Sequence, residues 1–161
     1  MSSSDPAPGF LRRLDAVERR LRAHAEAEVP AGLTHPDPPT GERWEAGQVW
    51  AHVAEFVPYW TEQLRDVLER YAGEPVPFGR TKADPGRLGA IERDRHEAVA
   101  SLFERTSAAM AEVRAWLPSL DRGAWTARGR HETLGDLDVE RCVEEFLVGH
   151  LEQHADQLDE L

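Results

Sequence analysis

The sequence predicts an all-α fold, and more narrowly a four-helix bundle in a single domain. Apolar residues recur with a period near 3.6 in four long segments, and stretches rich in proline and glycine separate those segments. No segment shows the alternating pattern of a half-buried strand. A bundle is the simplest way to bury four apolar stripes together, and 161 residues suffice for one core. We therefore expect a flexible N-terminal lead at residues 1–9 and one bundle domain at residues 10–161.

Each predicted helix has an apolar stripe and a recognisable boundary. The first covers residues 10–28, the second residues 45–72 and the third residues 88–117, and a proline follows the first and the third. Asp138 is the predicted N-cap of the last helix, which continues to the end of the chain. About 15 residues connect the second helix to the third, which is enough for the chain to cross the bundle. The predicted topology is therefore up-down-down-up, with the second and third helices parallel.

The charge balance argues against several classes of partner. The chain carries 19 Lys and Arg against 30 Asp and Glu, and this net charge of −11 repels nucleic acid and anionic membrane surfaces. The sequence has no basic start followed by an apolar run and no apolar run of about 18 residues, so we expect neither a signal peptide nor a membrane span. The lone cysteine, Cys142, excludes an internal disulfide and agrees with a reducing compartment. We expect a cytoplasmic protein, monomer or homodimer, that acts on a small molecule.

Two histidines lie on the apolar stripe of the last helix. His150 and His154 are four residues apart, which is one turn along a helix and about 40° around it, so both rings can reach one point. On the second helix, His52 follows Val49 by three residues and precedes Phe56 by four, so it faces the same interior. Three imidazoles from two helices match the way in which metal sites are built in bundle cores.

A buried imidazole has an ordinary explanation and a functional one. A ring nitrogen without a partner costs about 1–3 kcal/mol, and a backbone carbonyl can be the partner of any single histidine. For three histidines on apolar stripes, a bound divalent transition metal is the better explanation. Zinc and nickel are the first candidates, and ferrous iron also accepts imidazole. Three neutral ligands leave at least one coordination position open, which is typical of catalytic rather than structural sites.

The same residues carry a resemblance to a known family. The stretch WEAGQVWAHVAEFVPYWTEQL, followed far downstream by GDLDVERCVEEFLVGHLEQHADQL, resembles the DinB/YfiT-like superfamily of metal-binding four-helix bundles. The anchors are a tryptophan ahead of a histidine in the second helix, here Trp44 and His52, and an HxxxHxxQL ending that runs from His150 to Leu158. That superfamily includes mycothiol-dependent maleylpyruvate isomerases, which have a carboxylate at the position of His150, and bacillithiol S-transferases. The resemblance implies metal ligation by His52, His150 and His154.

Three further residues are candidates for supporting the metal ligands or for contacting a substrate. Glu55 and Gln157 each follow a candidate ligand by three residues, so each can accept a hydrogen bond from a ring nitrogen that faces away from the metal, although either could equally be solvated. His131 precedes the last helix and could fold over the mouth of the bundle, but a role in stabilising a turn is the simpler explanation. Cys142 lies more than about 10 Å from His150 along the helix axis, so we do not expect it to take part.

Three functions are compatible with such a site. The leading hypothesis, which the resemblance implies, is a metal-dependent transferase or isomerase that uses a low-molecular-weight thiol of the mycothiol type on a small electrophile. The metal would stabilise the thiolate, so no protein nucleophile is required. The first alternative is a metal-dependent hydrolase with a metal-bound water, for which Glu55 is the candidate general base. The second alternative is a non-catalytic metal-binding bundle, which predicts a fourth protein ligand such as His131.

Overall fold

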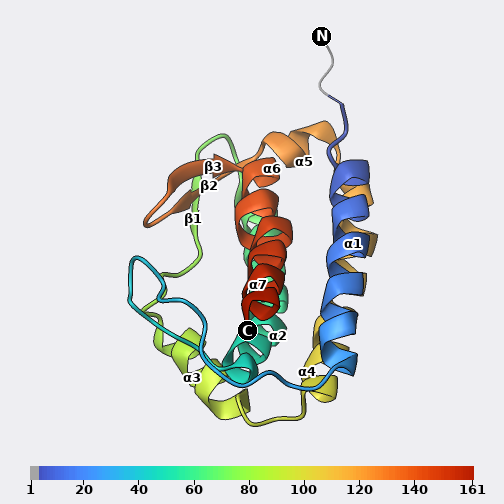
Figure 1. Cartoon of the computed structure of the whole chain (residues 1–161). Helices are drawn as coiled ribbons and strands as arrows, with labels where there is room; N and C mark the ends of the chain where they lie inside the picture. The colour runs from blue at the N-terminus through green and yellow to red at the C-terminus, as the bar shows by residue number, and fades with distance from the viewer. Residues whose placement is uncertain (1–3) are drawn as a thin grey trace.

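Four long helices lie side by side in the computed structural model, which describes residues 4–161, and a small sheet lies near one end of them (Figure 1). The bundle helices are α1 (Ala7–Glu26), α2 (Ala46–Arg70), α4 (Val99–Trp116) and a last helix of three consecutive segments, namely α6 (Val139–Cys142), a π-helical segment (Val143–Val148) and α7 (Gly149–Glu160). The shorter elements are α3 (Pro85–Asp94), α5 (Arg122–Thr126), a 3₁₀ turn (Leu117–Ser119) and the strands β1 (Val76–Phe78), β2 (Arg128–His131) and β3 (Gly135–Asp138). The predicted four-helix bundle is confirmed.

The first helix begins at Ala7, three residues before its predicted start, so residues 7–9 of the expected lead are helical. One proline lies just before this helix and another in its first turn, where a helix tolerates them because its first N–H groups have no intrahelical partner. Val17 and Leu21 are almost fully buried and define the inward face. Residues 1–3, the beginning of the expected lead, lie outside the described residues.

Helix α2 forms the centre of the bundle. Its start has a capping box, in which the Glu45 backbone N–H donates to Oε1 of Gln48 at 2.9 Å and the Glu45 side chain accepts from the Gln48 backbone. Pro58 lies inside the helix on its exposed side. Because α2 contacts α3, α4 and α7, side chains from several elements can meet on its surface. No helix within residues 4–161, α2 included, is long and apolar enough to cross a membrane.

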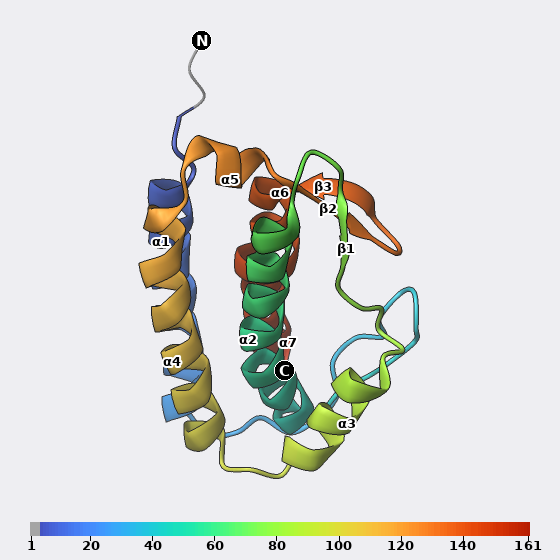
Figure 2. The same cartoon turned by 180° about the vertical axis from the view of Figure 1, so that it is seen from behind.

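The helix directions confirm the predicted up-down-down-up topology. Figures 1 and 2 show that α2 and α4 run in the same direction, whereas α1 and α7 run in the opposite one. The connection between α2 and α4 carries β1 and α3 along one side of the bundle. As a result α7 lies antiparallel to α2 and in contact with it, which brings the two histidine-bearing helices together.

The prediction of one continuous helix over residues 88–117 is wrong. The chain forms α3, breaks, and starts α4 after Ala98, whose ψ of 133° is not helical. The break follows from the close packing of α3 on the start of α2, where a Cβ at Gly47 would lie only 2.2 Å from the carbonyl oxygen of Arg95. Figure 2 shows α3 and α4 as separate helices that are joined by a loop at the lower end of the bundle. Tertiary packing therefore overrides a local periodicity that is continuous in the sequence.

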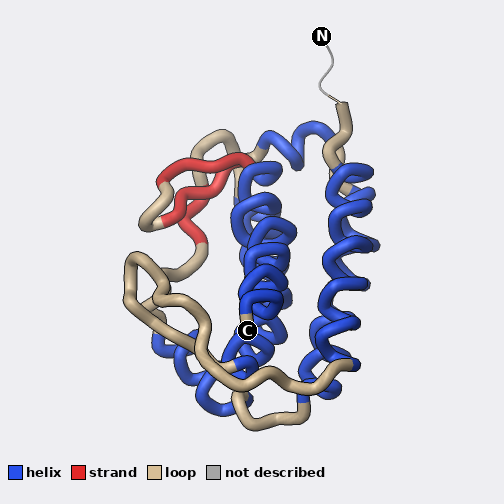
Figure 3. Tube along the Cα trace, in the orientation of Figure 1, coloured by secondary structure: helices blue, strands red, loops and turns tan. Residues whose placement is uncertain are grey.

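The expectation that the chain contains no strands is also wrong. Figure 3 shows a small sheet beside the bundle, in which β1 pairs in parallel with β2, and β2 pairs in antiparallel fashion with β3. Each strand has only three or four residues, and the parallel pair joins segments that are far apart in the sequence, such as Val76 and Gly129. Gly129 and His131 fill the buried positions of β2, so the strand has no apolar alternation to detect. The predicted N-cap at Asp138 is confirmed, because its side chain accepts a hydrogen bond from the Arg141 backbone N–H.

Candidate metal centre

His52 lies on the buried side of α2, and its side chain is 3% exposed. The period that places Val49, Val53 and Phe56 in the core also places this imidazole there. Its Nδ1 is 2.8 Å from Oε1 of Glu55, one turn further along the helix. This contact fixes the orientation of the ring and leaves Nε2 as the nitrogen that is free for another partner.

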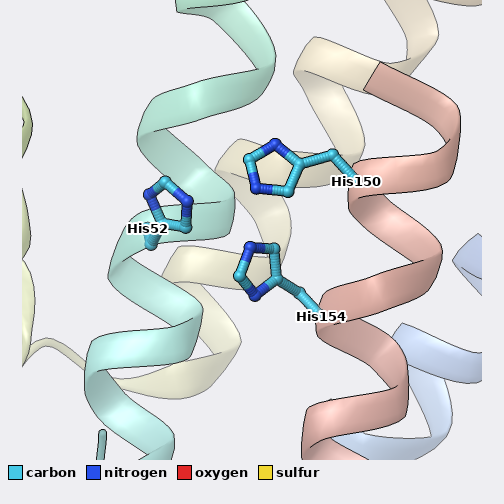
Figure 4. A group of neighbouring side chains, drawn as sticks. All are labelled: His52, His150 and His154. Carbon is cyan, nitrogen blue, oxygen red and sulfur yellow. The ribbon is translucent and has the colours of Figure 1, made fainter. Parts of the chain in front are cut away.

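His150 and His154 approach His52 from α7. His154 is 6% exposed, and its Nδ1 is 2.6 Å from Oε1 of Gln157. Within residues 4–161, Nε2 of His154 is buried with no hydrogen-bond partner, whereas Nδ1 of His150 faces away from the other two rings (Figure 4). A buried nitrogen without a partner costs about 1–3 kcal/mol, so the fold retains Nε2 of His154 at the expense of its own stability.

The three imidazoles converge on one space between α2 and α7. Figure 4 shows one ring nitrogen of each imidazole turned toward the other rings, and the three candidate ligand atoms lie within 4.8 Å of one another. The ring centroid of His52 is 5.2 Å from that of His150 and 4.8 Å from that of His154. Two nitrogens bound to the same zinc ion lie at most about 4.2 Å apart, so a small rotation of the rings would close the site. The geometry fits a divalent metal, and so does Nε2 of His154, which has no other partner.

Aromatic rings pack against the imidazoles. Phe56 stacks on His150 with ring centroids 4.0 Å apart, and Trp44 stacks on His154 at 6.2 Å. Trp44 also meets His52 edge-on at 5.2 Å. Aromatic pairs contribute about 0.5–1.5 kcal/mol each beyond their burial. These contacts limit rotation of the three rings and so preorganise the site.

Burial keeps the three imidazoles neutral near pH 7. It lowers the pKa of His52 and of His150 well below the usual value, and it lowers the pKa of His154 to about 4. Repulsion from neighbouring imidazoles lowers the pKa of His52 and of His150 further. A neutral imidazole can donate its lone pair to a metal without first losing a proton.

Glu55 joins His52 to a buried arginine. Both oxygens of the Glu55 carboxylate accept hydrogen bonds from Nη2 of Arg80, at 2.5 and 2.6 Å, and both side chains are 8% exposed. Burial raises the pKa of Glu55, whereas Arg80 opposes that rise. A carboxylate on the far nitrogen of a metal-binding histidine commonly orients the ring. Glu55 is placed for that role and not for a role as a base at the point where the rings converge.

His131 lies on β2, outside the cluster of the three histidines, and lines the cavity onto which His52 and His150 open. Its Nε2 is 2.9 Å from the carbonyl oxygen of Arg80, and its Nδ1 is the acceptor for the backbone N–H groups of Thr133 and Leu134. One ring nitrogen therefore bonds to the backbone of Arg80, and the other bonds to the backbone of the turn that follows β2. Gly79 permits this approach, because its φ is 86° and a Cβ there would lie 2.8 Å from the His131 ring.

A cavity of about 490 Å³ opens onto His52 and His150. A smaller cavity of about 70 Å³ shares these two histidines and also reaches His154 and Gln157. The wall of the larger cavity combines aromatic and charged side chains, which include Trp60, Phe146, Arg80, Lys82, Arg87 and Glu145. A small molecule can therefore reach the candidate metal centre from solvent.

Comparisons with known proteins identify the family and the fold of the chain. The sequence profile of the DinB superfamily matches residues 13–158. The chain belongs to the DinB superfamily. No curated protein matches the chain.

Two solved structures share the fold of this DinB-superfamily chain. One is YfiT from Bacillus subtilis, which is described as a probable metal-dependent hydrolase with an unusual four-helix bundle topology. It matches with a TM-score of 0.75 and 16% identity, over 99% of this chain and 87% of its own. An uncharacterised protein from Clostridium difficile 630 has a TM-score of 0.60 and 11% identity, over 99% of this chain and 96% of its own. At identities this low, the likeness shows a shared fold alone.

Three cations beside the candidate metal centre of this DinB-superfamily chain are not among the residues that the sequence predicted. Arg80, Lys82 and Arg87 all line the larger cavity. A signal existed, because these three cations fall within eight residues of a chain whose net charge is −11. Cys142, which was expected to take no part, is fully buried, and this burial raises the pKa of its thiol to about 12.

Proposed function

We propose that this chain is a metal-dependent enzyme that uses a low-molecular-weight thiol on a small electrophile, in a transfer or an isomerisation. The observation that carries the proposal is the convergence of three neutral imidazoles, two buried and that of His150 half-buried, beside a cavity of about 490 Å³. His52, His150 and His154 would hold the metal, with zinc and nickel as the first candidates and ferrous iron as the next. Three protein ligands leave a position for an exogenous group.

A bound divalent metal would supply a Lewis acid that favours the deprotonated form of a thiol at neutral pH. The side chains of this chain would do the rest. Glu55 orients His52 and Gln157 orients His154, each through Nδ1 of the ring. In a transfer reaction the thiol sulfur bonds to the electrophilic carbon, the leaving group departs with the bonding electrons, and the thiol proton passes to solvent. No protein nucleophile is needed, which agrees with the burial of Cys142.

Hydrolysis is a second candidate function. The description of the Bacillus subtilis YfiT structure as a probable metal-dependent hydrolase favours it. Glu55 has a poor position for a general base, because its carboxylate is bonded to His52 and to Arg80. Glu145 would have to serve instead, since it lines the same cavity as His150, although it is paired with Arg141 at 2.6 Å.

A non-catalytic metal-binding bundle has less support. It needs a fourth protein ligand, and both ring nitrogens of His131 are engaged by backbone groups. The group of potential ligands found within residues 4–161 contains His52, His150 and His154 alone.

Metal analysis tests the first step of the proposal. Untagged protein is expected to bind zinc or nickel stoichiometrically, His150→Ala to lose most of that metal, and His96→Ala, which removes an exposed histidine, to retain it. Absence of stoichiometric metal after incubation with zinc, nickel and ferrous iron would contradict both enzymatic functions.

A paired activity assay separates the two enzymatic functions. Metal-loaded protein is incubated with monochlorobimane, with and without mycothiol or 2-mercaptoethanol, and separately with p-nitrophenyl acetate in the absence of thiol. The proposal expects turnover of the electrophile that requires both metal and thiol. Metal-dependent turnover that persists without thiol would favour the hydrolase.

A further inference from the structure

Arg87 is a buried arginine on the wall of both cavities beside the candidate metal centre. It is 6% exposed, and its backbone N–H donates to the N-capping carboxylate of Asp84 at 3.0 Å. Its Nη1 donates to the carbonyl oxygen of Lys82 at 2.7 Å, and its guanidinium carbon lies 5.3 Å from the ring centroid of Trp44. Backbone and side chain are therefore both held in position.

The other two cations of the larger cavity are hydrogen-bonded to carboxylates, whereas Arg87 has only a longer ion pair. Arg80 and Lys82 each contact both oxygens of a carboxylate at 2.8 Å or less. Arg87 meets Glu42 at 3.7 Å, which is too long for a hydrogen bond, and Glu42 already accepts one from Nε1 of Trp44 at 2.9 Å. Within residues 4–161, Nε and Nη2 of Arg87 donate no hydrogen bond to the protein, and neither atom is sealed away from solvent.

A buried guanidinium with two donor atoms that have no protein acceptor lowers the stability of the fold. Burial lowers the pKa of Arg87, and the negative charges of Glu42 and Glu55 only partly oppose this shift. Charges that are removed from water normally have a close counter-ion. A planar guanidinium with two free donors matches the two oxygens of a carboxylate, and such paired hydrogen bonds are among the stronger ones in proteins.

The guanidinium of Arg87 and two of the three histidines pack around the same tryptophan, Trp44. The Trp44 ring lies 5.3 Å from the guanidinium carbon, 5.2 Å from the ring of His52 and 6.2 Å from the ring of His154. The guanidinium and the imidazoles are thus neighbours of the same indole. A ligand only a few atoms long can touch both.

We propose that Arg87 binds a carboxylate of the small molecule that reacts at the three histidines. The substrate class is then a short organic acid that carries its thiol or its electrophilic carbon a few atoms from the carboxylate. The placement of the reacting atom rests on the proposed function, whereas the recognition of the carboxylate can be measured without turnover.

Matched pairs of probes test the recognition by isothermal titration calorimetry on zinc-loaded protein. The first pair is 3-mercaptopropionate and 3-mercaptopropionamide, which place the carboxylate on the thiol. The second pair is 4-methylbenzoate and 4-methylbenzamide, which are unreactive and represent an electrophile with a carboxylate. In the wild type we expect at least one carboxylate to bind about 10- to 100-fold more tightly than its amide, the range of a charged hydrogen-bond pair. The pair that shows the preference identifies which reactant carries the acid.

Two variants assign the preference to Arg87. Arg87→Met is expected to reduce the preference to less than about twofold while zinc content is retained. Arg93→Met is the matched control, because Arg93 is exposed, pairs with Asp94 and does not line either cavity. Should Arg87→Met not fold, Arg87→Lys keeps the charge without the planar fork and is expected to reduce the preference partially.

Two results would overturn the inference: no preference for either carboxylate in the wild type, or a preference that Arg87→Met retains. Failure of the proposed function is visible separately, as zinc-loaded wild type that has no thiol-dependent turnover. In that case a carboxylate preference lost in Arg87→Met would still establish Arg87 as the anion-binding residue.

Discussion

Replacement of His154 by leucine is expected to leave the metal-free protein as stable as the wild type, or more stable. In the metal-free wild type, Nε2 of His154 is buried without a partner, which costs about 1–3 kcal/mol. Leucine fills a similar volume against Trp44 and has no polar atom. The substitution loses the hydrogen bond between Nδ1 and Gln157, worth about 0.5–1.5 kcal/mol. The free energy of unfolding at pH 7 should therefore change by between about −0.5 and +2.5 kcal/mol.

Metal reverses the sign of this effect. Zinc at 100 times its dissociation constant stabilises a protein by about 2.7 kcal/mol, which corresponds to an increase of roughly 5–11 °C in Tm for a domain of this size. His154→Leu removes one of three candidate ligands, so most of that increase should disappear. Urea unfolding in the presence of EDTA measures the first effect, and thermal unfolding with and without zinc measures the second.

His96→Leu is the matched control for this experiment, because it makes the same replacement at an exposed histidine outside the site. It should leave the zinc-dependent increase in Tm unchanged. The reasoning is refuted if His154→Leu destabilises the metal-free protein by more than about 2 kcal/mol. It is equally refuted if zinc raises the Tm of His154→Leu as much as that of the wild type.

Three further predictions concern residues near the site. Glu55→Gln keeps an acceptor for the imidazole but removes the charge, and should lower zinc affinity about 10- to 100-fold in competition with a chromophoric chelator, whereas the exposed Glu62→Gln should not. Because burial raises the pKa of Cys142 to about 12, native protein should resist iodoacetamide at pH 8, react faster as the pH rises toward that value, and react fully once unfolded; fast alkylation of native protein at pH 8 would contradict this. Gly149→Ala would place a Cβ 2.3 Å from the carbonyl oxygen of Glu144, so we expect a loss of about 1–3 kcal/mol in urea unfolding, and an unchanged midpoint would argue against that clash.

The bundle and the convergence of the histidines could be predicted because both follow from local rules. The period of 3.6 residues places His52 on the same face as the buried residues of α2, and the spacing of four places His150 and His154 on one side of α7. The topology followed from the length of a single connection. The period, the spacing and the length of one connection were therefore enough to place the three histidines in the same part of the bundle.

The cationic wall could not be predicted in the same way, because it depends on contacts between distant segments. Arg80 reaches Glu55 only because β1 pairs in parallel with β2, and because Gly79 lets the backbone pass close to the His131 ring. Arg87 reaches the cavity only because the predicted third helix is broken and α3 packs separately on α2. Neither condition leaves a periodic signal in the sequence.

The π-helical segment explains how ligands on an apolar stripe come to lie at a cavity wall. At the end of this segment the N–H of Gly149 donates a hydrogen bond to the carbonyl oxygen of Glu144, five residues earlier. Gly149 has no Cβ, which leaves room for that carbonyl. One extra residue in the turn rotates everything after it by about 100° relative to a regular helix. Leu151 and Ala155 are therefore the fully buried residues of α7, while His150 is only half-buried and lines both cavities.

A regular helix would instead have directed the His150 and His154 stripe at the centre of the core, as the uninterrupted period of the sequence suggests. There a metal would be enclosed and its fourth position closed to any small molecule. The wide turn leaves the spacing of the two imidazoles intact and moves them together to the edge of the core. Because it ends at Val148, two residues before His150, it sets the register of both histidines against His52 and their access to a substrate at the same time.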